Sequence, residues 1–584
     1  MIYVLKWLVP FWAKYKKKVA FIILLGMLSA GLRVITPLII KNIVNGFQTN
    51  PSVDYLTLNA LVICGVGILS YIVGINAAGS RAWMNIRFEW DCRQKVYEHI
   101  LKLDNEFFSE RTTGDIITRL IDDIYDKISW FSCSGVFRFI QSAFTLIAVI
   151  STIFYLNFKL SLFILFPLPF ILALSSKTSK SLLEKFNVLQ KTISNIYEYL
   201  EISFSGIKVI KANSKEEAQY KFFTKKTAEQ KKAEIDSGKT SVIFSYFFHY
   251  ASYIIIIMLY AVGGKEVIDG KITLGEVIAF QAYSIFLIFP LMDIGQFFVR
   301  GNRAKASIKR VDELLRCRPK IKSPTSPIIL DKVKKVEYYK VSLKIKDKYI
   351  LQDISFSVEE GSKASVVGKT GCGKSYLLNL LPRFMDPSSG EIRVNGIDIK
   401  KYDISSLRSK IGYAPQDASV FSDTLLMNIK MDNKLLSQDN IEKAISTSKL
   451  SNDLAKFPKG LDTYIGAKGL SISGGQKQRL QIARALAINP QILILDDTTS
   501  AMDADTENSF WNSLAENYPA LTCLIATHRV MTIAGSDLII VLDEGRIDSM
   551  GKHNELLRTS RLYRQIYEKE KLEEEFIAKQ TENK

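Results

Sequence analysis

The sequence predicts two domains of different classes: an α-helical domain with six membrane spans, followed by an α/β domain. A chain of 584 residues is longer than one hydrophobic core normally supports. Long apolar runs separated by basic segments fill the first half, whereas strand-like and helical patterns alternate in the second. We place the membrane domain at residues 1–316, a proline-containing linker at 317–332 and the α/β domain at 333–584.

The net charge of +18 indicates contact with anionic lipid rather than with nucleic acid. Many of the basic residues lie beside apolar runs, as Lys14 and Lys18 do, which is typical of the cytoplasmic flanks of membrane spans. Residues 1–18 are amphipathic and are expected to form a helix on the membrane surface. The 6 cysteines have no metal-like spacing, so free thiols are expected.

Six apolar runs each approach the ~20 residues that a helix needs to cross a bilayer. They are residues 19–40, 56–78, 131–156, 160–176, 241–263 and 274–298. The stretches 81–127 and 177–240 are rich in Lys and Arg, which places them and both chain ends in the cytoplasm. Both stretches are too long for ordinary loops, so we expect helices that extend the spans into the cytoplasm.

Polar residues inside the spans are candidate substrate contacts, because burying them in lipid is costly. The candidates are Arg33, His249, Asp293 and Gln296. The alternative is that they face a water-filled cavity or pair with one another.

A phosphate-binding loop is expected where the strand-like residues 364–367 meet a helix. Backbone N–H groups in such a loop surround phosphates, and this strand-to-helix context disfavours a chance glycine-rich turn. Lys374 is expected to reach the β- and γ-phosphates of ATP, and the Ser375 hydroxyl to bind Mg²⁺. The predicted ATP-binding residues of the loop are Gly368, Lys369, Thr370, Gly371, Cys372, Gly373, Lys374 and Ser375.

Two acids end the apolar strand 492–495. Asp496 is expected to hold Mg²⁺ through water. Asp497 lies where a glutamate would position or deprotonate the attacking water, and its side chain is shorter by one C–C bond, about 1–1.5 Å. Since a misplacement of about 1 Å can cost ~10²-fold in rate, we expect slow hydrolysis. The alternative is that a backbone shift or a bridging water restores the geometry.

A run of small residues precedes the helical pattern at residues 477–480. It consists of Ser473, Gly474, Gly475 and Gln476. A helix N-terminus of this kind can bind an anion, and since no phosphate is available locally, we expect it to serve a nucleotide on another subunit. A plain helix cap is the alternative.

These motifs together resemble those of ATP-binding cassette (ABC) transporters of the half-size exporter type, over nearly the whole chain. The resemblance implies that Ser473–Gln476 is the signature acting on a partner's ATP, that Asp503 belongs to the D-loop, that His528 is the switch histidine, and that Gln416 is a second Mg²⁺ contact. It also implies a multi-pass protein of a bacterial cell membrane, with its nucleotide domain in the cytoplasm. Two segments resemble those that turn at the surface of the nucleotide domain; they run from Phe107 to Asp123 and from Phe204 to Ala212.

The pairing of an intact signature with Asp497 is similar to the weak-site half of heterodimeric bacterial exporters. The resemblance therefore implies a second half-transporter with the catalytic glutamate as partner. A homodimer with two slow sites and a non-transporting, ATP-sensing regulatory subunit are the alternatives.

Two further expectations concern single features. The adenine-stacking aromatic is replaced by Ile345, for which Tyr349 can substitute, and the tail from Tyr567 is expected to be a solvated helix without chemistry of its own.

Overall fold

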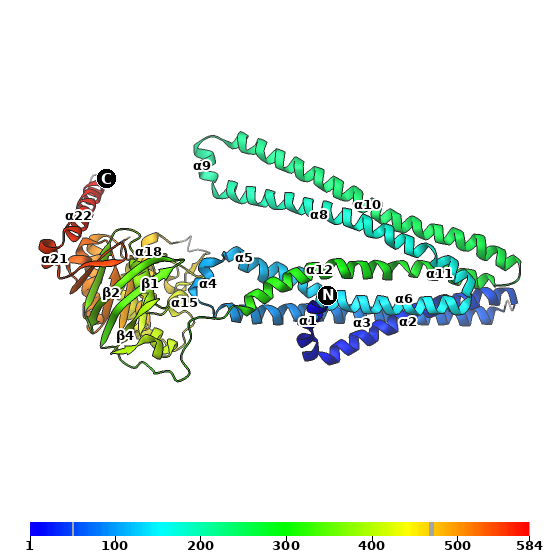
Figure 1. Ribbon diagram of the computed structural model, residues 1–584, viewed down its shortest axis with the longest axis horizontal. Coiled ribbons are helices and arrows are strands. Elements are labelled where there is room, and N and C mark those ends of the chain that lie inside the picture. Colours follow the sequence, from blue (N-terminus) through cyan, green and yellow to red (C-terminus); the bar gives the residue numbers. More distant parts are fainter. Residues whose placement is uncertain (50–51, 467–471, 501, 583–584) are drawn as a thin grey trace. The chain divides into compact units, whose positions relative to one another are not determined.

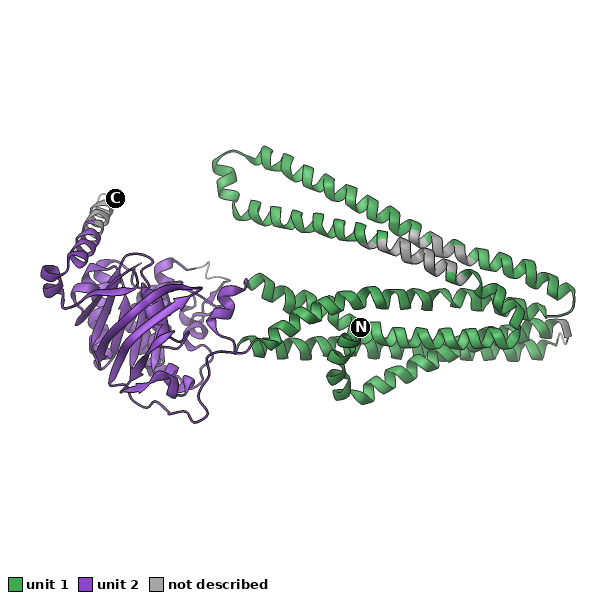
Figure 2. Cartoon of the chain, in the orientation of Figure 1, with its two compact units in different colours: residues 1–101, 113–317 green, residues 102–112, 318–584 purple. Residues whose placement is uncertain are grey.

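The computed structural model describes residues 1–49, 52–466, 472–500 and 502–582, in two compact units (Figure 2). Unit 1 comprises Met1–Leu101 and Thr113–Cys317, and unit 2 comprises Lys102–Thr112 and Arg318–Lys584. Within these ranges, side chains are not described at residues 48–49, 168, 170–180, 183, 244–245, 247–249, 251–252 and 573–582.

Unit 1 consists of helices in its described part. They are α1 (Ile2–Lys14), α2 (Lys16–Thr49), α3 (Val53–Ile100), α5 (Thr113–Thr118), the π-helical segments η1 (Arg119–Ser129) and η2 (Phe131–Gly135), α6 (Val136–Leu156), α7 (Phe158–Leu165), α8 (Pro167–Ser205), α9 (Ile207–Ala212), α10 (Glu216–Ile268), α11 (Leu274–Phe286) and α12 (Ile288–Arg316).

The long helices continue from apolar into basic sequence without a break, as expected for spans with cytoplasmic extensions. Helix α3 has 48 residues, which corresponds to about 70 Å of helix. Helices α8 and α10 run side by side and are joined through α9 (Figure 1).

Four helical stretches are long and apolar enough to cross a membrane, among the residues described: Lys16–Phe47, Val53–Ile100, Thr113–Leu156 and Leu274–Arg316. They contain the first, second, third and sixth predicted spans. The fourth and fifth predicted spans fall on α7, α8 and α10, where many side chains lie outside the described set.

A buried carboxylate joins two helical segments of unit 1. The side chain of Asp123 in η1 is fully buried, and Arg310 of α12 binds it through Nε at 2.7 Å and through a second nitrogen at 2.6 Å. Ser307 donates to it at 3.0 Å and Lys127 at 2.8 Å. Since a buried charge is tolerated only when it is paired and hydrogen-bonded, this cluster fixes η1 against α12.

Unit 2 is an α/β domain built on two main sheets. The six-stranded sheet has the order β12-β11-β3-β10-β9-β6, in which β6, β9, β10, β3 and β11 are parallel and β12 is antiparallel. Its strands are β3 (Lys363–Gly368), β6 (Ile411–Ala414), β9 (Ile492–Asp496), β10 (Thr522–Ala526), β11 (Leu538–Asp543) and β12 (Arg546–Gly551). The antiparallel sheet has the order β2-β1-β4-β5, from β1 (Lys335–Ile345), β2 (Lys348–Glu359), β4 (Ser389–Val394) and β5 (Ile397–Asp398). A short pair consists of β7 (Asp423–Thr424) and β8 (Tyr464–Ile465).

The central parallel strands read as continuous apolar runs because both faces of the sheet are covered. All residues of β9 and of β10 are buried, for example. The helical segments of this unit are α4 (Asn105–Glu110), α13 (Lys374–Leu380), η3 (Ile399–Lys401), α14 (Ile404–Ser409), α15 (Leu425–Lys430), α16 (Gln438–Thr447), α17 (Ser451–Leu454), η4 (Gly460–Asp462), α18 (Gly474–Ala487), α19 (Ala504–Asn517), α20 (Val530–Ala534), α21 (His553–Thr559) and α22 (Arg561–Glu582).

Helix α4 belongs to unit 2, although we assigned its residues to the membrane domain from the sequence. The Asp104 carboxylate, at its N-cap position, accepts hydrogen bonds from the backbone N–H groups of Lys320 and Ile321. Lys320 also pairs with Glu106 at 2.6 Å. Within unit 2, the start of α4 is thus bound to the backbone at residues 320 and 321.

Candidate nucleotide site

The phosphate-binding loop follows β3 and leads into α13, as the sequence predicts. Gly371 and Gly373 have φ values of +83° and +107°, a region that side chains disfavour. A Cβ at Gly373 would lie 3.1 Å from the Ile350 carbonyl oxygen, so β2 approaches the loop too closely for a larger residue. The glycine pattern is therefore required by the backbone path of the loop.

Lysine and serine side chains at the start of α13 lie at the edge of the parallel sheet. The Lys374 ammonium donates to the carbonyl oxygens of Gly368 at 2.7 Å and of Lys369 at 3.1 Å, and so lies across the loop. The Ser375 hydroxyl donates to the Asp496 carboxylate at 3.0 Å. A hydroxyl and a carboxylate are oxygen ligands of the kind that Mg²⁺ takes, so this pair fits the ion.

Both acids after β9 lie in a poorly solvated place. Burial raises the pKa of Asp496, and the neighbouring negative charge of Asp497 raises it further, whereas the Ser375 hydrogen bond lowers it. Burial also raises the pKa of Asp497, and the neighbouring His528 and Lys374 side chains partly offset this rise. Perturbed carboxyl groups beside a phosphate-binding loop mark a functional site.

The backbone of Asp497 is held on both sides. Its N–H donates to the Ala526 carbonyl at 2.9 Å, its carbonyl accepts from the Ser500 hydroxyl at 2.9 Å, and its φ is +52°. Since β9 and β10 pair directly up to Asp496 and Ala526, His528 follows its strand close to Asp497.

The other residues predicted for this site occupy different elements. Gln416 is exposed just after β6. Ser473 caps α18: its hydroxyl accepts from the Gln476 N–H at 3.3 Å, and the Gln476 side chain accepts from the Ser473 N–H at 2.9 Å. Gln476 and Arg479 also bind the buried carboxylate of Asp453. The helix-cap geometry is therefore present, and it leaves open space beside Gly474.

Two further polar residues, Gln478 and Asp503, lie in α18 and at the start of α19. Gln478 in α18 donates to the Ser500 hydroxyl at 3.1 Å, which connects α18 to the segment before α19. Asp503 is exposed at the start of α19, and a hydrogen bond from Thr506 lowers its pKa. Ser471 and Ala501 lie outside the described residues.

An exposed aromatic ring is available near the phosphate-binding loop. Ile345 packs against the hydrophobic core, whereas Tyr349 is 52% exposed on the hairpin between β1 and β2. The Lys344 ammonium lies 5.7 Å from the centre of the Tyr349 ring. The residue after Tyr349 is Ile350, whose carbonyl lies against Gly373 of the loop.

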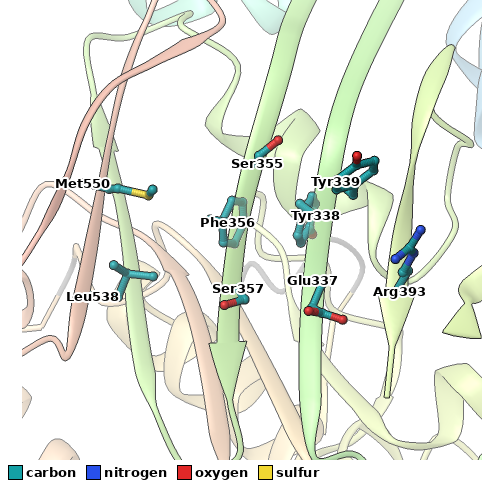
Figure 3. Close-up of a pocket in the computed structure, with 9 residues that line it drawn as sticks. All are labelled: Glu337, Tyr338, Tyr339, Ser355, Phe356, Ser357, Arg393, Leu538 and Met550. Carbon is teal, nitrogen blue, oxygen red and sulfur yellow. The ribbon is translucent and has the colours of Figure 1, made fainter. Parts of the chain in front are cut away.

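A hollow of about 450 Å³ lies away from the phosphate-binding loop, over β1, β2 and β4 and the strands next to them (Figure 3). Tyr338 and Phe356 stack at its floor with ring centres 4.4 Å apart. Its lining includes none of the residues predicted for the nucleotide site. We assign it no role.

Among the described side chains of unit 1, no hydrogen bond or ion pair joins the candidates Arg33, Asp293 and Gln296 to one another. Asp293 of α12 accepts from the Ser142 hydroxyl of α6 at 2.8 Å. Arg33 and Gln296 are exposed on α2 and α12, and the side chain of His249 lies outside the described set.

The sequence analysis missed a second polar group in the membrane unit. Arg81 of α3 donates to the Gln141 side chain of α6 at 3.3 Å, and Gln141 donates to the Ser29 hydroxyl at 3.5 Å. We had read Arg81 as the start of a basic cytoplasmic stretch. The helical pattern continues from the apolar run through Arg81 without a break, and this continuity could have indicated that Arg81 belongs to the same helix as the second span.

Comparison with known proteins agrees with this architecture. The family model described as "ABC transporter transmembrane region" matches residues 19–291, and the model described as "ABC transporter" matches residues 351–500. The "Probable multidrug resistance ABC transporter ATP-binding/permease protein YheI" of Bacillus subtilis (strain 168) is 31% identical over 581 residues, which is 96% of each chain. The "Multidrug resistance-like ATP-binding protein MdlA" of Escherichia coli (strain K12) is 28% identical over 573 residues, with 96% of this chain and 95% of that protein covered.

A solved structure has the same fold. It is that of a bacterial Atm1-family ABC exporter with ATP bound; the TM-score is 0.80 at 25% identity, covering 95% of this chain and 98% of the other. The relatives, like this chain, carry both domains in one polypeptide. This chain belongs to the ABC transporter family, as an exporter whose transmembrane domain is followed by an ATPase domain.

Proposed function

We propose that this chain is one half of a heterodimeric exporter and that its own ATP site hydrolyses slowly. The observation that carries the proposal is Asp497. Its side chain is one methylene shorter than glutamate, and hydrogen bonds hold its backbone at both the N–H and the carbonyl. A backbone shift that restores the missing reach would break these bonds, which favours a slow site over a compensated one.

The residues around the phosphate-binding loop are suited to hold ATP firmly. Lys374 and the loop N–H groups bind the phosphates. Ser375, Asp496 and, from its exposed loop, Gln416 are the proposed residues of the Mg²⁺ site. The ion, when bound, neutralises phosphate charge. His528 is proposed to contact the terminal phosphate from the end of β10, beside Asp497.

Adenine is proposed to stack on Tyr349 rather than at position 345. Tyr349 is exposed on the hairpin whose next residue touches the phosphate-binding loop, whereas Ile345 faces the core. A base stacked on an aromatic ring gains about 1–3 kcal/mol.

The signature is proposed to act on the partner's ATP. Ser473 and Gln476 cap each other, and Asp453 fixes the side chain of Gln476, so the N-terminus of α18 is rigidly built. The N–H groups of Gly474 and Gly475, at the positive end of a 14-residue helix, then favour an anion. This chain combines an intact signature with an aspartate at position 497. We therefore propose a heterodimer in which ATP is hydrolysed at the partner's site. Asp503, exposed at the start of α19, is proposed to face the same partner.

The exported substrate is proposed to be an amphipathic small molecule, lipid or peptide. The names of two relatives describe multidrug resistance proteins. The membrane unit offers apolar helices with few polar groups, among which the Ser142–Asp293 pair is the proposed contact for a polar end. The protein is proposed to cross the cell membrane six times, with the cassette on the cytoplasmic side.

Purification of the tagged chain from its native membrane tests the pairing. A second half-transporter with glutamate at the position of Asp497 should co-purify in equal amount. Recovery of this chain alone as a dimer would instead support the homodimer, which the intact signature also permits. ATP-dependent uptake of dyes by inside-out vesicles, lost in Lys374→Ala, separates an exporter from a subunit that only senses ATP.

A further inference from the structure

The last helix of the chain is not a free appendage. Tyr563 of α22 is fully buried in a cluster with Val367 of β3 and Ile533 of α20. Ile566 and Tyr567, one turn on, pack against the same cluster. The Tyr563 hydroxyl is also 2.6 Å from Nδ1 of His553. Our expectation of a merely solvated tail from Tyr567 was therefore wrong for Tyr567 itself, which packs against this cluster.

The carboxylate of Glu570 follows on this packed face. Positions 563, 566 or 567, and 570 lie one above the other on a helix. Oε1 of Glu570 is 3.4 Å from Nδ1 of His528, and the Glu570 side chain is only 17% exposed. The neighbouring Glu568 is exposed. The packing of α22 therefore places Glu570, and not the exposed Glu568, beside His528.

His528 follows β10, the strand that pairs directly with β9 up to Ala526 and Asp496. His528 stands two residues after Ala526, whose carbonyl binds the N–H of Asp497 at 2.9 Å. Glu570 therefore contacts a residue that follows β10 at the sheet edge where β9 ends.

We propose that Glu570 is a positioning residue: it accepts the Nδ1–H of His528 and so holds Nε2 toward the terminal phosphate of ATP. A carboxylate on one ring nitrogen fixes the tautomer and the orientation of the ring, which leaves the other nitrogen for its task. When the ring is protonated both nitrogens donate, so one bond to Glu570 and one to phosphate are compatible. The inference rests on the proposed role of His528.

The test compares the affinities of the purified full-length chain for ATP and ADP, with Mg²⁺, by displacement of a fluorescent nucleotide. Glu570→Ala is expected to reduce the preference for ATP over ADP about tenfold, the lower end of the range found when the partner of a metal-binding side chain is removed, and to leave ADP affinity unchanged. Glu570→Gln, which keeps an acceptor oxygen, should restore most of the preference. Glu568→Ala is the matched control and should behave as the native chain.

A double-mutant cycle distinguishes positioning from simple support of the fold. In a His528→Ala background, Glu570→Ala should have no further effect on the ratio, because its action passes through the ring. An unchanged ratio in Glu570→Ala, with a lowered ratio in His528→Ala, overturns this inference alone. An unchanged ratio in His528→Ala overturns the proposed role of His528 as well. A raised ratio in Glu570→Ala would mean that the contact restrains His528, and it also overturns the inference.

Discussion

The Ser375 hydroxyl lies 3.0 Å from the Asp496 carboxylate, so the first turn of α13 and the end of β9 meet at one point. Burial raises the pKa of Asp496 above its ordinary value of 3.8. A carboxyl with a raised pKa keeps its proton to a higher pH than a free aspartate, and a protonated carboxyl does not hold Mg²⁺.

The Mg²⁺-dependent part of ATP affinity should therefore weaken as the pH falls, at a pH above that at which free aspartate titrates. Nucleotide affinity measured against pH, with Mg²⁺ and with EDTA, checks this. Asp496→Asn should remove the Mg²⁺ dependence at every pH. A dependence that survives in Asp496→Asn would assign the ion to other residues.

The same raised pKa predicts a stability cost at neutral pH. The folded state binds the proton of Asp496 more tightly than the unfolded state does, so stability is present at low pH and is lost as pH rises through the folded pKa. Without nucleotide, Asp496→Asn should therefore unfold at a higher temperature than the native chain at pH 7.5. An equal or lower midpoint would contradict the burial argument.

Tyr349 should carry the adenine contact. Tyr349→Ala is expected to weaken ATP binding about tenfold, since loss of one base–aromatic stack costs about 1–3 kcal/mol. Tyr349→Phe should bind normally. Tyr339→Ala is a matched control, because Tyr339 is 50% exposed on the same sheet, against 52% for Tyr349. Equal weakening in the control, or none in Tyr349→Ala, would move the adenine site elsewhere.

Arg310 should be needed for the stability of the membrane unit. Its removal leaves Asp123 buried with too few partners, and breaking a buried pair typically costs about 3–5 kcal/mol. The thermal midpoint of Arg310→Ala should fall by about 5 °C or more. Arg316→Ala, which removes a pair between the exposed Arg316 and the half-buried Asp312, should change it little. Similar midpoints for the two variants would show that the Asp123 cluster is not a stabilising element.

Lengthening the side chain at position 497 should raise hydrolysis. Asp497→Glu is expected to increase phosphate release by the purified chain about tenfold or more, since it moves the carboxylate by one C–C bond. Asp497→Asn should leave the slow native rate nearly unchanged. A normal rate in the native chain that Asp497→Asn abolishes would show that Asp497 serves as an effective base.

Local sequence patterns were enough to predict the order of domains and the phosphate-binding loop. Gly371, Gly373 and Lys374 lie on one continuous segment, so their roles follow from spacing and context. The fold class and the exporter family were confirmed. The count of six spans and the heterodimer stay predictions.

Contacts between distant segments could not be predicted in this way. Glu570 is one acid among several on an exposed helical pattern, and only the packing of Tyr563 decides which of them meets His528. The grouping of α4 with unit 2 depends likewise on Asp104 and the backbone of Lys320. Both contacts depend on tertiary packing between distant segments, and no periodic pattern in the sequence indicates such packing.

The most direct test of the central claim is the fate of the γ-phosphate on this chain. The native complex is incubated with Mg²⁺ and 8-azido-ATP labelled on either the α- or the γ-phosphate, crosslinked by light and separated into its chains. The account predicts that this chain retains both labels equally, and that Lys374→Ala retains neither. Retention of the α-label alone would contradict it, because this site would then have hydrolysed its ATP.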